Sequence, residues 1–293
     1  MKTTFITSIV LSIVILLFGF ASEPSSNQIP GSRNLLQQML QSIDNVKTLK
    51  YSFKAKERIE GKPFVTELDV KYNESPLRLY VYTKSEPNKG VEILYREGEW
   101  ENKALVNPGK WLPNIKFSPY HPRLRKNQHN TILQSGFGML RSIISDAMNR
   151  ADRDAPEQFE EVFKIKGEIT FQGKACYELE ITDPEFAFVS YTVKDGEDIN
   201  KIAYGRGISG YLIVQNNASL DDFDDLEPGM TVKIPTSYAK KTILYIDKEN
   251  NLPIVQIMFD EIGEFERYEF LNLKVNPSIK EIEFTKDFEG YKF

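Results

Sequence analysis

The sequence has 293 residues, of which 37 are Lys or Arg and 42 are Asp or Glu, so the formal net charge is −5. This length accommodates one large domain or a large and a small one, and the absence of a dense basic cluster argues against nucleic acid as a partner. Cys176 is the only cysteine. No intrachain disulfide can form, and the position of Cys176 in an alternating strand predicts a buried, inert thiol.

The N-terminus has the pattern of a secretory signal peptide. Lys2 precedes an apolar run from Phe5 to Phe20. Gly19 and Ala21, on either side of Phe20, are the small residues around a cleavage point. We assign residues 1–21 to a cleaved signal and expect export to the periplasm or cell envelope. The run is shorter than the roughly 20 residues that a spanning helix needs, and an uncleaved anchor is the alternative. Residues 22–33 are rich in Ser, Pro, Asn and Gly and predict a flexible linker.

The spacing of apolar residues from 34 to 106 predicts a helix followed by an antiparallel meander. Residues 34–46 carry apolar side chains at helical spacing. From Thr48 the period changes to two, and five strands joined by short turns lead to Val106, the last of them from Trp100 to Val106. One face of this sheet is aromatic and aliphatic, and the other is rich in Lys and Glu.

The middle of the chain supplies the cover for that apolar face. Residues 107–128 contain four prolines and predict an irregular crossing. The segment from Met139 to Met148 predicts an amphipathic helix that covers the concave side of the sheet, and Pro156 to Val162 adds a helical turn. The sheet resumes with two strands from Phe163 to Thr182 and three from Lys241 to Val275.

Residues 191–235 interrupt strands that belong together and predict a β-α-α-β unit. Asp198 is a suitable N-cap for a first helix and Ser209 for a second. Gly205 and Gly207 end the first helix, and Pro228-Gly229 turns the chain into the second strand.

This unit resembles a LysM module. The resemblance is carried by Tyr191-Thr-Val-Lys-x-Gly196, by Ile202-Ala203, by the Asn that closes the second helix, and by Pro228-Gly229 with Ile234-Pro235. One departure is Gly196-Glu197-Asp198-Ile199, where the family has Gly-Asp-Thr-Leu. The resemblance implies attachment to peptidoglycan or another glycan containing N-acetylglucosamine. It places the glycan-binding residues in two loops, at Gly196, Glu197, Asp198, Ile199, Asn217, Ala218, Ser219 and Leu220. The alternative is that the module survives only as a packing unit.

Residues 34–190 and 236–293 resemble the periplasmic lipoprotein-carrier superfamily of LolA-like folds. The resemblance is carried by the N-terminal helix, the meander and the closing hairpin with Tyr245-Ile246-Asp247 and Leu252-Pro253. Pro76-Leu-Arg-Leu-Tyr80, Gly136-Phe-Gly138 and Asp260-Glu-Ile-Gly263 are similar to a bacterial envelope family of unknown function, DUF1571. The expected fold is therefore α+β, with a curved antiparallel half-barrel covered by helices and an inserted βααβ LysM module.

The carrier resemblance implies an apolar cavity for acyl chains, and hence a lipid or lipoprotein partner. The cavity candidates are the apolar residues of the sheet and the covering helix, namely Tyr51, Phe53, Leu68, Val70, Leu79, Val81, Phe137, Leu140 and Ile144. The alternative is that the helices of the protein fill this face completely.

No residue pattern indicates catalysis, a metal or a cofactor. The two histidines, His121 and His129, lack the spacing of a zinc site and fall in the Pro-rich crossing. The acidic run from Asp221 to Asp225 lacks the Gly and terminal Glu of a calcium loop. We therefore expect a binding protein. A purely structural or protein-binding scaffold and a cell-wall hydrolase with an unrecognised site are the alternatives.

Overall fold

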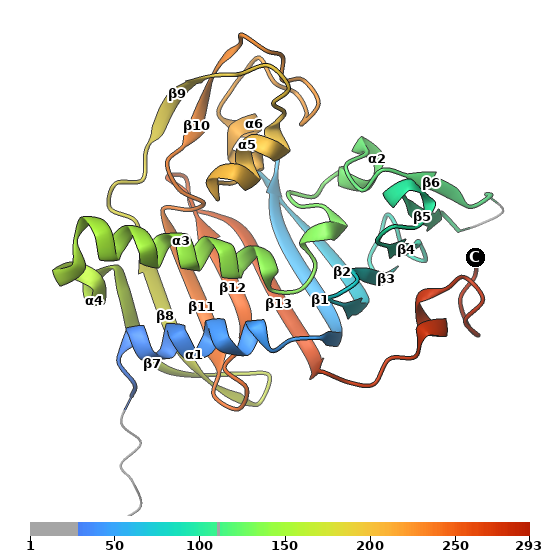
Figure 1. The fold of residues 1–293 in the computed structure, drawn as a ribbon, viewed down its shortest axis with the longest axis horizontal. Coiled ribbons are helices and arrows are strands. Elements are labelled where there is room, and N and C mark those ends of the chain that lie inside the picture. The colour runs from blue at the N-terminus through green and yellow to red at the C-terminus, as the bar shows by residue number, and fades with distance from the viewer. Residues whose placement is uncertain (1–28, 110–111) are drawn as a thin grey trace, which may run out of the picture. The chain divides into compact units, whose positions relative to one another are not determined.

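The computed structural model describes residues 29–109 and 112–293. The predicted signal segment and most of the linker therefore lie outside the described residues. No helix in the described ranges combines the length and the apolar character needed to cross a membrane. From Gly31 onward the chain forms one compact unit, which combines a large antiparallel sheet with helices on one of its faces (Figure 1).

Within the described residues the main sheet has eleven strands in the order β6-β5-β4-β3-β2-β1-β13-β12-β11-β8-β7. The strands are β1 (Thr48–Ile59), β2 (Lys62–Asn73), β3 (Arg78–Thr83), β4 (Glu92–Arg96), β5 (Ala104–Asn107), β6 (Ile115–Phe117), β7 (Phe163–Phe171), β8 (Lys174–Thr182), β11 (Lys241–Asp247), β12 (Pro253–Phe259) and β13 (Glu264–Val275). All pairs are antiparallel, and β1 joins the two meanders by pairing with β13. The predicted curved antiparallel sheet is confirmed.

The helices that cover the sheet are α1 (Ser32–Asp44) and α3 (Gly138–Asp154), and both carry their apolar residues on one side. They pack against each other and lie across the same face of the sheet (Figure 1). Leu36 and Met39 of α1 are fully buried, as are Leu140 and Ile144 of α3 to within 2 %. Burial of such side chains supplies about 1.5–3 kcal/mol each before entropy is counted, and it holds the helices on the sheet.

The opposite face of β3, β4 and β5 is covered by the C-terminal tail. The tail begins at η4 (Glu281–Phe284), and its Tyr291 ring stacks on Tyr80 with centroids 3.7 Å apart. Glu283 accepts from Lys50 and Lys71, and although burial alone would raise its pKa, these bonds lower it to about 2. The tail is therefore part of the folded domain.

Residues 188–235 form a separate unit between β8 and β11, which pair with each other. It consists of β9 (Phe188–Thr192), α5 (Ile199–Arg206), α6 (Gly210–Gln215) and β10 (Thr231–Pro235), and β9 pairs only with β10. The caps are as predicted, because Asp198 accepts from the Lys201 N–H and Ser209 from the Leu212 N–H. Gly207 ends α5 in the left-handed region, with φ of 62°. We call residues 188–235 the inserted unit.

Two expectations about the first half of the chain are wrong in detail. Residues 100–102 do not begin a strand; they form the turn η1 (Trp100–Asn102), all with positive φ, and β5 starts only at Ala104. The Pro-rich crossing is less irregular than predicted. It contains β6 and the short helix α2 (Pro122–Arg125), and the turn η2 (Ile132–Gln134) follows it. The remaining short elements are η3 (Pro156–Gln158) and α4 (Phe159–Val162). Together they form the helical turn that the sequence predicted.

Candidate functional site: two adjoining hollows and a buried histidine–carboxylate cluster

The larger hollow lies where the crossing, α3 and the inserted unit meet. Its volume is about 430 Å³, and we call it the outer chamber. Apolar parts of its wall come from Leu133, Met139, Ile143, Ala203 and Ile208, and polar parts from residues on the rims of β2 and β4 and from the crossing. The inserted unit therefore supplies one wall of the chamber.

A smaller hollow of about 90 Å³ lies on the helix-covered face of β1, β2 and β13, and we call it the inner hollow. It shares the lining residues Asn130, Gln134, Ser135 and Met139 with the outer chamber, so the two adjoin. Among the predicted cavity residues, five line the inner hollow, namely Tyr51, Phe53, Leu68, Val70 and Val81. The other four pack in the main core, namely Leu79, Phe137, Leu140 and Ile144. The helices thus fill most of this face and leave a narrow apolar space.

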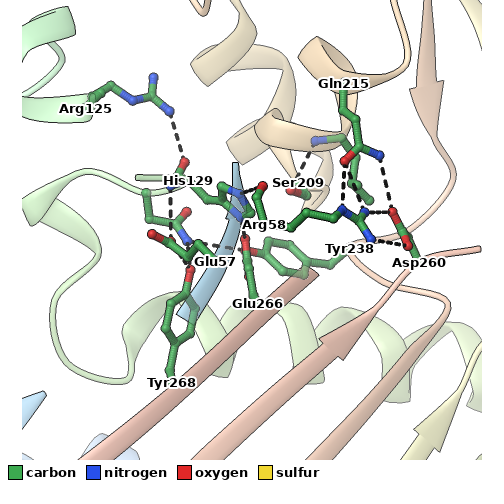
Figure 2. Close-up of polar contacts among 12 residues, drawn as sticks. Glu57, Arg58, Arg125, His129, Ser209, Gln215, Tyr238, Asp260, Glu266 and Tyr268 are labelled. Atoms are coloured by element: carbon green, nitrogen blue, oxygen red, sulfur yellow. Dashed lines mark hydrogen bonds and ion pairs between the residues drawn. The ribbon is translucent and has the colours of Figure 1, made fainter. Parts of the chain in front are cut away.

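A cluster of ionisable residues lies beside both hollows (Figure 2 shows the cluster). His129 and Tyr238 line the outer chamber, and Glu57 and Tyr268 line the inner hollow. Glu57 on β1 and Glu266 on β13 are direct cross-strand partners, and His129 from the crossing lies against both. The Nδ1 atom of His129 is 2.9 Å from Glu266 Oε1, and its backbone N–H donates to Glu57 Oε1 at 3.1 Å. All three side chains are at most 4 % exposed. A charge buried this deeply must be paired.

Both ring nitrogens of His129 have a polar partner. The Nε2 atom faces the backbone carbonyl of Arg58 at 3.0 Å, and the Nδ1 atom faces the carboxyl group of Glu266 at 2.9 Å. A protonated ring donates to both partners. Burial alone would lower the pKa of His129, but Glu57 and Glu266 outweigh it and raise the pKa.

Two buried tyrosines complete the cluster. Tyr268 donates its hydroxyl proton to Glu57 at 2.7 Å, and Tyr238 donates to Glu266 at 2.9 Å. Burial raises the pKa of both tyrosines well above 10, so they stay protonated donors. Burial also raises the pKa of Glu57.

The same cluster is the group that could hold a divalent cation. Ligand atoms of Glu57, His129 and Glu266 lie within 4.8 Å of one another. Once Nδ1 lost its proton, Nε2–H would still donate to the Arg58 carbonyl, which is the second bond that a metal-bound histidine usually makes. The spacing rules applied to the sequence did not find this group, because its members are 72 residues or more apart.

Three contacts fix the inserted unit against this cluster. The Tyr211 ring of α6 stacks on His129 with centroids 3.5 Å apart. Arg58 donates to Gln215 of α6 at 3.1 and 3.2 Å and forms an ion pair with Asp260, and both partners of the pair are largely buried (Figure 2). Leu212 is fully buried in the main core. The unit is therefore packed into the domain through α6.

The first predicted glycan-binding loop is used mainly for internal contacts. Gly196 is exposed, but its carbonyl accepts from the Lys201 ammonium. Glu197 accepts from the Tyr191 hydroxyl and the Lys194 N–H. Asp198 caps α5, and Ile199 is fully buried in the core of the inserted unit.

The second loop is more open. Asn217 is held by the backbone of Lys233 on both sides, Ala218 and Ser219 are exposed, and Leu220 is buried in the same core as Ile199. Asn217, Ala218 and Leu220 line a groove of about 950 Å³ between this loop and the crossing. The structure thus brings Ile199 and Leu220 together in a core, and it places only the second loop in a groove.

Arg125 of α2 lies between the two loops. It donates to Asn200, the residue after the first loop, at 2.7 Å, and its guanidinium lies 3.3 Å over the ring of Phe223, close to the second loop. It therefore separates the two halves of the predicted glycan surface. No sequence pattern pointed to Arg125.

A sequence signal for part of the cluster did exist. Every second side chain of β1 points inward, and Glu57 follows Tyr51, Phe53 and Ala55 in this alternation. On β13, Glu266 alternates in the same way with Tyr268 and Phe270. A carboxylate at an inward position of a strand needs a buried partner, so both positions could have been singled out. The sequence could not name His129 as that partner.

Comparisons with known proteins give one family match and several solved structures of low sequence identity. A family model described as a protein of unknown function, DUF1571, matches residues 46–191. No curated protein sequence matches the chain.

Similar solved structures include the lipoprotein LppX of Mycobacterium tuberculosis, which is 9 % identical with a TM-score of 0.41, over 86 % of this chain and 99 % of that one. A LolA superfamily protein of Nitrosomonas europaea is 11 % identical with a TM-score of 0.35, over 88 % and 99 %. An uncharacterized conserved protein of Thermus thermophilus is 8 % identical with a TM-score of 0.39, over 87 % and 93 %. The chain is thus similar to the DUF1571 family from residue 46 to Tyr191 in β9, and the helices of the inserted unit fall outside that match.

Proposed function

We propose that the protein is an exported, non-catalytic envelope protein that binds a lipid or the acylated part of a lipoprotein in the two adjoining hollows. The observation that carries this proposal is that a narrow, mainly apolar space adjoins a wider, partly polar chamber. A molecule with one apolar chain and a polar head matches that division.

The volumes limit the ligand. At about 30 Å³ for each group of the size of a water molecule, the outer chamber of about 430 Å³ holds roughly 14 such groups, and the inner hollow of about 90 Å³ holds roughly three. The outer chamber falls in the usual range for small-ligand sites. The space fits one acyl chain, and each buried methylene contributes about 0.8 kcal/mol.

The direct test is mass spectrometry of organic extracts from the purified protein, combined with displacement of a fluorescent fatty-acid probe. Ala55 lies in the inner hollow, so Ala55→Leu fills part of that space and weakens probe binding by about tenfold. Ala175 lies exposed on β8, and Ala175→Leu is the matched control that leaves binding unchanged. Extracts free of acyl compounds together with no probe binding would refute the proposal.

Peptidoglycan binding by the inserted unit is a second candidate, favoured by the groove that contains Asn217, Ala218 and Leu220. A pull-down with purified peptidoglycan tests it. Ala218→Asp adds bulk and charge at an exposed position of this groove and should abolish retention, whereas Ala175→Asp should not. Equal retention of both variants would place the glycan outside this groove, and no retention of the wild type would leave the scaffold alternative. Zymography on cell walls addresses the hydrolase alternative.

A further inference from the structure

Arg125 is a buried cation in the wall of the outer chamber. Its side chain belongs to α2, and the residue is 5 % exposed. Its Nη1 donates to Asn200 Oδ1 at 2.7 Å and its Nη2 to the His129 carbonyl at 3.2 Å (Figure 2 shows the second bond). Both acceptors are neutral, so these bonds orient the guanidinium without balancing its charge.

Within the described part of the chain no carboxylate pairs with Arg125, and its guanidinium lies over the ring of Phe223. Its Nε atom is buried and has no hydrogen-bond partner among those residues, and no ion pair there includes this side chain. Burial lowers the pKa of Arg125, and Tyr204, Asp222 and Asp224 act against that effect. Structural buried arginines are normally paired with a carboxylate. An unpaired one beside a cavity is a typical ligand-binding group.

The other charged groups of the chamber have partners. Glu74 accepts from the Tyr72 hydroxyl, and Glu97 accepts from the Leu77 N–H at 2.9 Å. Both come from the strand side of the chamber, whereas Arg125 comes from the crossing. Both ring nitrogens of His129 already have a partner. Arg125 is therefore the cation of this wall whose charge no carboxylate of the described residues balances.

We propose that Arg125 binds the anionic head group, a carboxylate or a phosphate, of the single-chain amphiphile in the hollows. This inference rests on the proposed function. A guanidinium recognises either anion by charge-assisted hydrogen bonds. The apolar chain would then extend past Met139 toward the inner hollow, since Met139 lines both spaces.

The test compares probes with different heads and the same chain of about twelve carbons, because the hollows hold roughly 17 groups in all and the head occupies some of them. These are the fatty acid, the lysophospholipid and the fatty alcohol, each titrated against the full chain. The acid or the lysophospholipid should bind about tenfold or more tighter than the alcohol, in keeping with hydrogen bonds to a charged group. Which of the two binds tighter distinguishes carboxylate from phosphate. Inorganic phosphate alone should compete weakly, because it lacks the chain.

Arg125→Met should remove the preference for the anionic head while the alcohol still binds, and Arg125→Lys should keep part of it. Arg123→Met, an exposed arginine on the same helix, is the control that keeps the full preference. The wild-type comparison needs no variant, so the proposal can be tested even if Arg125→Met does not fold.

Three outcomes would overturn this assignment. Equal binding of acid and alcohol by the wild type would show that no anion anchor exists, although the chain site stands. An equal loss of both probes in Arg125→Met would show that Arg125 only holds the inserted unit. The third outcome concerns short-chain acids. If they exceed their alcohols in affinity by the same factor as the long-chain probes, the anion lies in the neighbouring groove, which Arg125 also lines. Failure of every probe, including the alcohol, would instead refute the proposed function.

Discussion

Glu57 and Glu266 lie directly opposite each other on β1 and β13, on the face that the helices cover. Two carboxylates in that position repel each other and destabilise a sheet. His129 bonds both carboxyl groups, Glu266 through its ring Nδ1 and Glu57 through its backbone N–H, and a positive charge on the ring offsets the repulsion. The two meanders pair at this point, where β1 lies beside β13. The crossing contacts them through His129, and α6 joins because Tyr211 stacks on the His129 ring.

Replacement of His129 should therefore destabilise the whole domain. His129→Gln removes the positive charge and leaves two carboxylates buried, which costs about 3–5 kcal/mol. Urea unfolding followed by circular dichroism measures the change. In the double variant His129→Gln with Glu57→Gln, one of the two charges is also removed, so part of the loss is recovered. A single variant as stable as the wild type would mean that the cluster contributes nothing.

The same cluster should make stability depend on pH. The pKa of His129 is raised above 6.5 and that of Glu57 above 4.5, so the native state binds more protons than the unfolded state. The stability that each group contributes is complete below the pKa that the group has in the unfolded chain. It is lost as the pH rises through the higher pKa that the group has in the folded protein. Urea unfolding at about pH 6 and pH 9 tests this prediction for His129, in the range above its unfolded pKa. His129→Gln should show a smaller decrease than the wild type, and equal decreases would contradict the prediction.

The regular elements followed from residue patterns, and the polar site did not. The alternation of apolar and polar residues predicted β1 and β2, and apolar residues at helical spacing predicted α1 and α3. Both patterns arise because one face of each element is buried. The turn at Trp100–Asn102 was missed because three successive left-handed residues have no strong signal when none is Gly. His129 and Arg125 could not be assigned, because their roles depend on where the crossing meets β13 and α5. Such tertiary contacts leave no local period in the sequence.

Gly207 should be intolerant of a side chain. It has φ of 62° at the end of α5, and a Cβ there would lie 2.9 Å from Asp146 of α3. Gly207→Ala should cost about 1–2 kcal/mol through the left-handed backbone. Gly205 has no atom within 4 Å of a Cβ and lies in the helix, so Gly205→Ala should stabilise by about 0.5–1 kcal/mol. Thermal melts of both variants measure the difference, and equal melting temperatures would contradict it.

Cys176 should be silent in the folded protein and reactive in the unfolded one. It lies on β8, is fully buried, and burial raises the pKa of its thiol to about 11, with Asp247 adding to the effect. The thiolate is the reactive form, so a chromogenic disulfide reagent at about pH 8 should label the native protein only as fast as it unfolds. Labelling should be rapid in denaturant, where the thiol regains a pKa near 8.5. Rapid labelling of the native state would mean that β8 opens locally and that this side of the sheet is not a rigid support for the hollows.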